Sequence, residues 1–389
     1  MVNLRKYYNF LKEKDISKLL FKHSDIRPII EKHRKNDLLE VSEVGKSFEN
    51  REIYMIKAGN GKTKVMLWSQ MHGNEFVGTM AIFDILNLFN SENSDLRNIS
   101  DSLLQNLTIY FIPMLNPDGA EYETRRNAQS IDLNRDALAL TAPESRILEN
   151  LTNNIKPDFA FNLHDQEIYY GTENSENTVA LSFLTPSYDY EKTIDLSRQK
   201  SMKLIADIFR MLQNEIPGQV GKYNDSYMPN AFGDNIQKKG ISTILVEAGY
   251  IHGDVNRQKV RELYTTSLVF ALNSISEKKY LNNNIDTYKK IPFNIKLKFC
   301  DYILKNITII RKTGKFKTDI AIIRNILDSE SFTDLSEDFI IWDIGDLSNK
   351  SAFKTIDFRG KEINDQNNQI KRLKKANFLF MLMKAKKIT

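Results

Sequence analysis

Two kinds of hydrophobic pattern alternate between residues 51 and 275, and this alternation constrains the fold more than any other feature. Short apolar runs rich in β-branched and aromatic residues predict buried strands, and apolar residues three or four apart predict helices. The predicted strands are residues 51–58, 63–69, 107–115, 158–163, 179–184 and 241–246. The predicted helices are residues 76–89, 143–155, 191–212 and 255–275. Such alternation indicates an α/β fold, with a mixed, mostly parallel sheet covered by helices on both faces.

Both ends of the chain differ from this central region. Residues 1–45 are charged and carry apolar residues at helical spacing, which predicts a helical N-terminal segment. The polar residues 282–288 predict a linker. Short strand-like runs follow at residues 306–310, 320–323 and 339–344. We therefore expect two domains, residues 1–281 and a small β-rich C-terminal domain of residues 282–389.

The composition excludes several classes of protein. There are 55 Lys and Arg residues against 50 Asp and Glu, and the formal net charge of +5 gives no support to nucleic-acid binding. The single cysteine, Cys300, excludes an intrachain disulfide framework and a cysteine-based zinc finger. The N-terminus lacks a signal-peptide pattern, and the apolar run at 378–383 is too short to span a bilayer. We therefore expect a cytoplasmic protein that has no membrane partner.

Some familiar patterns are incomplete here. The tripeptide Gly61-Lys62-Thr63 ends like a phosphate-binding loop, but that pattern requires glycine at the position of Ile56. The sequence contains no His-Glu-x-x-His motif. Basic residues between 371 and 387 flank an apolar run. They favour a solvated edge around a final strand or helix over a nucleic-acid or membrane patch.

Histidine is scarce, and two of the histidines lie where predicted strands end. The full set is His23, His33, His72, His164 and His252. His72 follows strand 63–69 and precedes Glu75 by three residues, and His164 ends strand 158–163. For each histidine taken alone, a turn-capping or core position is the favoured interpretation. Two histidines and a carboxylate together form a catalytic zinc set that leaves a fourth position for water, so we predict one Zn²⁺ ion at these residues.

Two further segments carry charged side chains at the ends of apolar strands. Residues 116–135 form a long loop rich in arginine, whose planar guanidinium groups can bind carboxylates or stabilise an oxyanion. Surface ion pairing is the alternative interpretation of this loop. Glu247 ends the apolar strand 241–246, where a carboxylate must be solvated, paired or catalytic. An acid beside an activated water is what general-base hydrolysis requires.

These motifs together resemble the zinc carboxypeptidase family, the metallocarboxypeptidases of the pancreatic type. The likeness extends from about Val44 to Ile275. It rests on the motifs HGNE, NPDG, TRRN, DLNR, a strand-end histidine and VEAG, which occur in the family's order. The resemblance implies zinc-dependent hydrolysis of a C-terminal peptide bond. The C-terminal domain lies outside it, and a pancreatic-type activation segment is not evident.

The resemblance also implies a catalytic role for particular residues. The implied zinc ligands are His72, Glu75 and His164. Glu247 corresponds to the general acid and base. Arg125 corresponds to the arginine that polarises the scissile carbonyl, with the adjacent Arg126 as the alternative register. Asp132 corresponds to the residue that orients a ligand histidine, a role that also has a physical rationale.

Substrate binding is implied for a second group of residues. Asn134 and Arg135 correspond to the pair that grips the terminal carboxylate of the substrate. The mobile tyrosine of the family corresponds best to Tyr223, with Tyr227 as the alternative. Residues 232–235 are expected near the specificity pocket.

Other functions compete with the carboxypeptidase interpretation. A zinc amidase related to succinylglutamate desuccinylase and aspartoacylase would remove an acyl group from a small N-acyl amino acid. The NPDG and TRRN motifs favour a peptidase, and either enzyme would take a peptide or small amide with a free carboxylate. A non-catalytic binding protein is the less favoured alternative, because the candidate ligands and Glu247 are all present.

Overall fold

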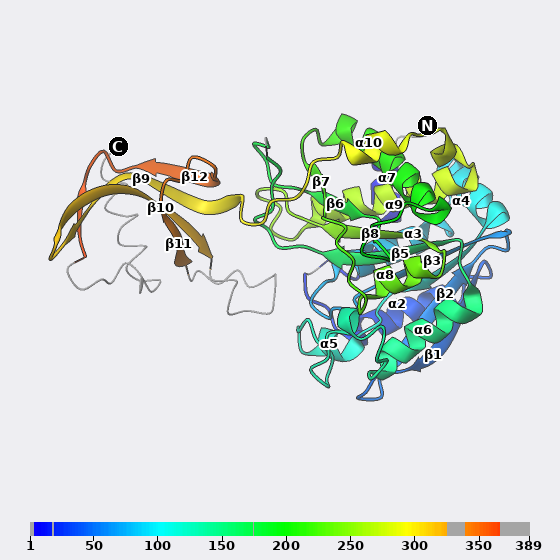
Figure 1. Ribbon diagram of the computed structural model, residues 1–389. Coiled ribbons are helices and arrows are strands. Elements are labelled where there is room, and N and C mark those ends of the chain that lie inside the picture. The colour runs from blue at the N-terminus through cyan, green and yellow to red at the C-terminus, as the bar shows by residue number, and fades with distance from the viewer. Residues whose placement is uncertain (1–3, 18, 174, 325–338, 366–389) are drawn as a thin grey trace. The chain divides into compact units, whose positions relative to one another are not determined.

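A computed structural model describes residues 4–17, 19–173, 175–324 and 339–365 (Figure 1). The chain divides into two compact units. The first contains the residues up to Glu167 and Thr172–Asn294, and the second contains Ile168–Gly171 and the residues from Ile295 onward. The division after Asn294 lies beyond the predicted linker at 282–288. The basic residues between 371 and 387 and the apolar run at 378–383 lie outside the described residues.

An eight-stranded mixed sheet forms the centre of the first unit, in the order β1-β2-β4-β3-β5-β8-β6-β7. The strands are β1 (Leu39–Lys46), β2 (Glu52–Ala58), β3 (Thr63–Ser69), β4 (Leu107–Ile112), β5 (Phe159–Asp165), β6 (Leu181–Leu184), β7 (Val220–Lys222) and β8 (Ser242–Ala248). Neighbours from β4 through β3 and β5 to β8 are parallel, whereas β1 with β2, β2 with β4 and β6 with β8 are antiparallel. The parallel strands therefore present their carboxyl ends at one edge of the sheet.

Helices cover both faces of this sheet, as Figure 1 shows. They are α1 (Tyr8–Leu11), α2 (His23–Arg34), α3 (Val77–Leu88), α4 (Ser94–Asn106), α5 (Pro117–Glu121), α6 (Pro143–Ile155), α7 (Leu196–Glu215), α8 (Phe232–Lys238), α9 (Gln258–Ser276) and α10 (Ile285–Lys289). Alternate side chains of β3 point to opposite faces, so Val65 and Leu67 join the core under α3 and α9. Met66 and Trp68 join the core under α6 and α8. The α/β prediction is confirmed.

Some local predictions are wrong. Within the segment predicted to be helical, residues 39–46 form strand β1. The polar residues predicted as a linker contain helix α10, whose Tyr288 is buried in the core of the first unit. Helix α4, Ser94–Asn106, was not predicted. No helix in the described parts of the chain combines the length and apolarity needed to cross a bilayer.

The second unit is a five-stranded sheet, which confirms the β-rich C-terminal region. Its strands are β9 (Phe299–Arg311), β10 (Gly314–Arg324), β11 (Phe339–Gly345), β12 (Ser351–Asp357) and β13 (Glu362–Asn364). The order is β11-β10-β9-β12, and β13 also pairs with β9. Tyr169 is fully buried in this unit's core against Phe299 and Ile303, although it lies far from them in sequence.

Candidate active site

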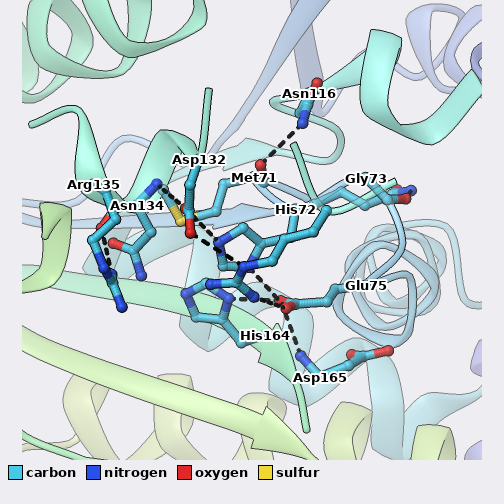
Figure 2. Close-up of polar contacts among 12 residues, drawn as sticks. Met71, His72, Gly73, Glu75, Asn116, Asp132, Asn134, Arg135, His164 and Asp165 are labelled. Atoms are coloured by element: carbon cyan, nitrogen blue, oxygen red, sulfur yellow. Dashed lines mark hydrogen bonds and ion pairs between the residues drawn. The ribbon is translucent and has the colours of Figure 1, made fainter. Parts of the chain in front are cut away.

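The three predicted metal ligands converge at the carboxyl ends of two neighbouring parallel strands. His72 and Glu75 follow β3, and His164 lies near the end of β5 (Figure 2). One oxygen of the Glu75 carboxylate is 2.7 Å from Nδ1 of His72, and the other is 2.7 Å from Nδ1 of His164. All three side chains are buried, and one ligand atom from each lies within 4.8 Å of the others. The structure therefore brings together residues that are 89 positions apart.

A close backbone contact shapes the turn that carries His72 and Glu75. A Cβ atom on Gly73 would lie 1.9 Å from the carbonyl carbon of Gly119 in α5, so only glycine fits there. Asn116 holds the same two segments together, because its side-chain amide donates to the carbonyl of Met71 at 3.2 Å (Figure 2). The HGNE and NPDG motifs thus form one packed structure.

Asp132 and Arg125 contact the ligands from the arginine-rich loop. Nε2 of His72 donates to Oδ1 of Asp132 at 3.1 Å. Arg125 donates through Nε to Oδ2 of Asp132 at 3.2 Å and through its terminal nitrogen to Glu75 at 3.1 Å. The neighbouring Arg126 instead donates to the backbone carbonyl of Ser130 at 3.0 Å. Of the two arginines, Arg125 is therefore the one that reaches the ligand cluster.

The donor chemistry of this cluster fits a zinc ion. When Asp132 accepts the proton of His72 Nε2, the lone pair of Nδ1 faces Glu75 and is free to bind a metal. In the described structure, Nε2 of His164 has no hydrogen-bond partner. Two imidazole nitrogens and a carboxylate that share one small buried volume match a three-ligand catalytic zinc set.

Electrostatics distinguishes the two glutamates of the site, the buried Glu75 and the half-buried Glu247. Burial opposes ionisation of Glu75, but the adjacent His72 and His164 outweigh it and hold the pKa of Glu75 well below its usual range. Burial raises the pKa of Glu247 well above its usual range, and the carboxylates of Glu75 and Asp165 act in the same direction. Glu75 thus stays ionised as a ligand should, whereas Glu247 is suited to exchanging a proton.

Glu247 lies directly beside the cluster because of strand register. It pairs with His164 across the parallel strands β5 and β8, and with Ser182 across the antiparallel strands β8 and β6. Its Oε2 atom is buried and has no hydrogen-bond partner among the described residues. A buried acceptor of this kind requires a partner such as water or substrate.

The predicted carboxylate-binding residues lie on the next turn of the loop. Oδ1 of Asp132 accepts the backbone amide of Asn134 at 2.9 Å and so caps the short 3₁₀ turn Leu133–Arg135. Oδ1 of Asn134 accepts the backbone amide of Phe232 at 3.1 Å, which joins this turn to the start of α8. Arg135 is exposed and donates to the carbonyl of Asn134 at 2.6 Å. Phe232, the first of the residues expected near the specificity pocket, therefore contacts the turn that carries Asn134 and Arg135.

The two candidate tyrosines have different neighbours. The hydroxyl of Tyr223 donates to Oε1 of Gln166 at 2.8 Å. The ring of Tyr227 packs edge-on against Tyr190, with centroids 5.1 Å apart. Gln166 was not predicted, although its position two residues after His164 on a strand end was a usable signal.

Comparison with known proteins finds similarity to zinc carboxypeptidases over part of the chain. Residues 30–208 match the family model described as zinc carboxypeptidase. Carboxypeptidase 2 of Trichophyton rubrum is 29% identical over 143 residues, which cover 34% of this chain and 26% of that protein. Carboxypeptidase B of Astacus astacus is 30% identical over 89 residues, which cover 22% and 28%. The matches thus span about a quarter of these curated relatives.

Solved structures share the fold. A metallo-carboxypeptidase from Burkholderia cenocepacia matches with a TM-score of 0.53 and 15% identity, covering 67% of this chain and 70% of that chain. A metallo-carboxypeptidase from Pseudomonas aeruginosa matches with a TM-score of 0.52 and 16% identity, covering 64% and 69%. The family model and the curated relatives thus show similarity to zinc carboxypeptidases over part of this chain, and the solved structures share its fold.

Proposed function

We propose that this protein is a zinc-dependent metallocarboxypeptidase that hydrolyses the last peptide bond of a substrate with a free C-terminal carboxylate. The observation that carries the proposal is the convergence of His72, Glu75 and His164 beside the half-buried acid Glu247. The similarity of residues 30–208 to the zinc carboxypeptidase family model supports the same chemistry.

Each residue around this cluster has a role in the proposed reaction. Zinc held by the three ligands would polarise the scissile carbonyl and lower the pKa of the attacking water. Glu247, with its raised pKa, takes a proton from that water and later delivers it to the leaving amine. A terminal nitrogen of Arg125 lies 3.1 Å from Oε1 of Glu75, so the guanidinium is next to the proposed zinc site. In the reaction, this guanidinium donates hydrogen bonds to the carbonyl oxygen of the substrate, on which negative charge develops.

We assign recognition of the substrate's C-terminal carboxylate to the turn that contains Asn134 and Arg135. The exposed guanidinium of Arg135 offers a planar pair of donors to a carboxylate. Asn134 is held in place between Asp132 and Phe232. A substrate without a terminal negative charge would lose this interaction, which makes cleavage specific for a free chain end.

The proposal is tested with two versions of one peptide, a free acid and a C-terminal amide. We expect the zinc-loaded protein to release the last residue of the free acid and to leave the amide intact. Glu247→Gln should bind zinc as the wild type does but lose turnover by about 10²–10⁴-fold, because the proton acceptor is gone. Equal cleavage of both peptides would refute the exopeptidase assignment. Cleavage of small N-acyl amino acids alone would identify an amidase instead.

A further inference from the structure

A polar cluster centred on the buried side chains of Gln166 and Ser182 lies beside the candidate active site. We call the side chains of Gln166, Ser182, Tyr223 and Asn294 the junction cluster. The amide oxygen of Gln166 accepts three hydrogen bonds: from Ser182 at 2.9 Å, from Tyr223 at 2.8 Å and from Asn294 at 3.1 Å. Asn294 also donates to Oγ of Ser182 at 2.8 Å. One amide oxygen therefore holds the hydroxyl of the candidate substrate-binding tyrosine.

The junction cluster is adjacent to the catalytic groups. Gln166 follows the ligand His164 by two residues, and its backbone amide donates to the carbonyl of Ala248 at 2.8 Å. Ser182 is the strand partner of Glu247. Gln166 is 3% exposed and Ser182 is fully buried. A small change in the orientation of the Gln166 amide would therefore be transmitted to Tyr223 without passing through solvent.

Two members of the junction cluster, Gln166 and Asn294, lie next to the two places where the chain passes from the first unit into the second. Gln166 is separated by one residue from Ile168–Gly171, which belong to the second unit. Asn294 is the last residue before the chain enters that unit for good. The two crossings are hydrogen-bonded to each other, because Gly171 and Ile295 exchange backbone hydrogen bonds of 3.2 and 2.8 Å.

Asn294 is held on the first unit by close backbone contacts. Its backbone amide donates to the carbonyl of Lys222 at 2.8 Å. A Cβ atom on Gly221 would lie 1.8 Å from Oδ1 of Asn294, so the asparagine side chain lies directly against this glycine. The side-chain amide of Asn294 uses both its hydrogens in the junction cluster, which fixes the direction in which the Gln166 oxygen points.

We propose that Gln166 and Asn294 are positioning residues that hold Tyr223 for substrate binding, so that the exit segment at Asn294 sets substrate affinity. This inference rests on the proposed function, because Tyr223 is taken to contact the substrate. Neither residue has a chemical role. Their loss therefore weakens binding of the peptide while the rate of the bound complex is unchanged.

The test compares Asn294→Asp with the wild type on the free-acid peptide. The variant keeps the size of the side chain but replaces its donor group with an acceptor. We expect KM to rise about threefold to tenfold, the equivalent of one hydrogen bond, with kcat within about twofold. Gly221→Ala should have the same effect, because the added methyl group displaces the asparagine. Asn283→Asp is the matched control, since the side chain of this buried asparagine accepts from Arg210 and has no contact with the junction cluster in the described structure.

A double-mutant cycle separates positioning from general damage. In a Tyr223→Phe background, Asn294→Asp should add no further increase in KM, because the hydroxyl that it positions is absent. Additive effects, an unchanged KM, or an equal effect of Asn283→Asp would each overturn the inference.

Calorimetric titration of the zinc-loaded proteins with the same peptide distinguishes the two proposals. Wild-type binding without cleavage, weakened in Asn294→Asp, would refute the peptidase function and support the positioning role. Wild-type cleavage with equal affinity in both proteins would do the reverse. Absence of peptide binding by the wild type would overturn both.

Discussion

Asp132 is the residue on which the geometry of the site depends most. One of its oxygens accepts from His72 and from the backbone amide of Asn134, and the other accepts from Arg125. The surrounding positive charges outweigh its burial and hold the pKa of Asp132 well below its usual range. A single carboxylate therefore orients a candidate metal ligand, the proposed catalytic arginine and the candidate carboxylate-binding turn.

Replacing Asp132 with asparagine should weaken zinc binding by about 10–100-fold, because His72 loses the charged acceptor that fixes its tautomer. Competition with a chromophoric chelator measures the affinity. Asp136→Asn is the matched control, since Asp136 is equally buried in the same loop but accepts from Thr141 and Ala142. Equal zinc affinity in wild type and Asp132→Asn would contradict this role.

At the residue scale, local motifs predicted the site well and distant contacts poorly. HGNE and the strand-end His164 are short patterns with a direct chemical meaning, and their residues do converge. The choice between Arg125 and Arg126 depends on the path of the loop, which a motif does not encode. The contact between Gln166 and Asn294 joins residues 128 positions apart, and no local pattern indicates it.

Among the elements, buried strands and amphipathic helices were the easiest to predict. β3 and α6 have the predicted bounds, because a continuous apolar run and a proline-initiated amphipathic segment define them. β1 was mistaken for helix because it is an edge strand with a bulge between Glu43 and Gly45, which breaks the alternation of a regular strand. In the supposed linker, the polar Asn284 is the N-cap of α10.

Helix α2 contains a buried histidine that makes stability depend on pH. The ring of His33 is fully buried, stacks on Phe83 and has no hydrogen-bond partner among the described residues. Burial and the nearby Lys32 lower the pKa of His33 to about 4. The unfolded chain binds this proton near pH 6.5 and the folded protein does not, so stability falls as the pH drops between these values.

We expect this histidine to cost about 3 kcal/mol of folding free energy by pH 4 relative to pH 7.5. Urea unfolding of wild type and His33→Leu across this range measures the difference. The variant should lose less stability in acid, whereas His252→Leu, at an exposed site, should follow the wild type. Parallel curves for wild type and His33→Leu would rule out the assignment.

At the scale of the whole molecule, a buried ion pair fastens the N-terminal segment to the core. Arg261 of α9 and Asp84 of α3 are both fully buried and joined by hydrogen bonds of 2.5 and 2.9 Å. Arg261 also donates to the carbonyls of Glu13 and Ile16, and Asp84 accepts from Tyr8. The segment before α2 is thus held by groups that belong to the centre of the first unit.

Arg261→Met should lower the free energy of unfolding by about 3–5 kcal/mol, because Asp84 would remain as an uncompensated buried charge. Chemical denaturation measures this loss. The control Arg97→Met removes an exposed guanidinium from α4 and should change stability by less than about 1 kcal/mol. A similar loss of unfolding free energy in both variants would show that the Arg261–Asp84 ion pair contributes no more to stability than an exposed arginine does.

The placement of Tyr169 has a consequence for synthesis on the ribosome. The side chain of Tyr169 completes the core of the second unit, and its hydroxyl accepts from the backbone amide of Arg324 at 3.0 Å. The ribosome nevertheless adds Tyr169 long before it makes β9. The nascent chain must therefore carry an exposed loop, only a few residues after the ligand His164, until β9 and β10 have emerged. The final ordering of residues 168–171 is thus delayed to a late stage of translation.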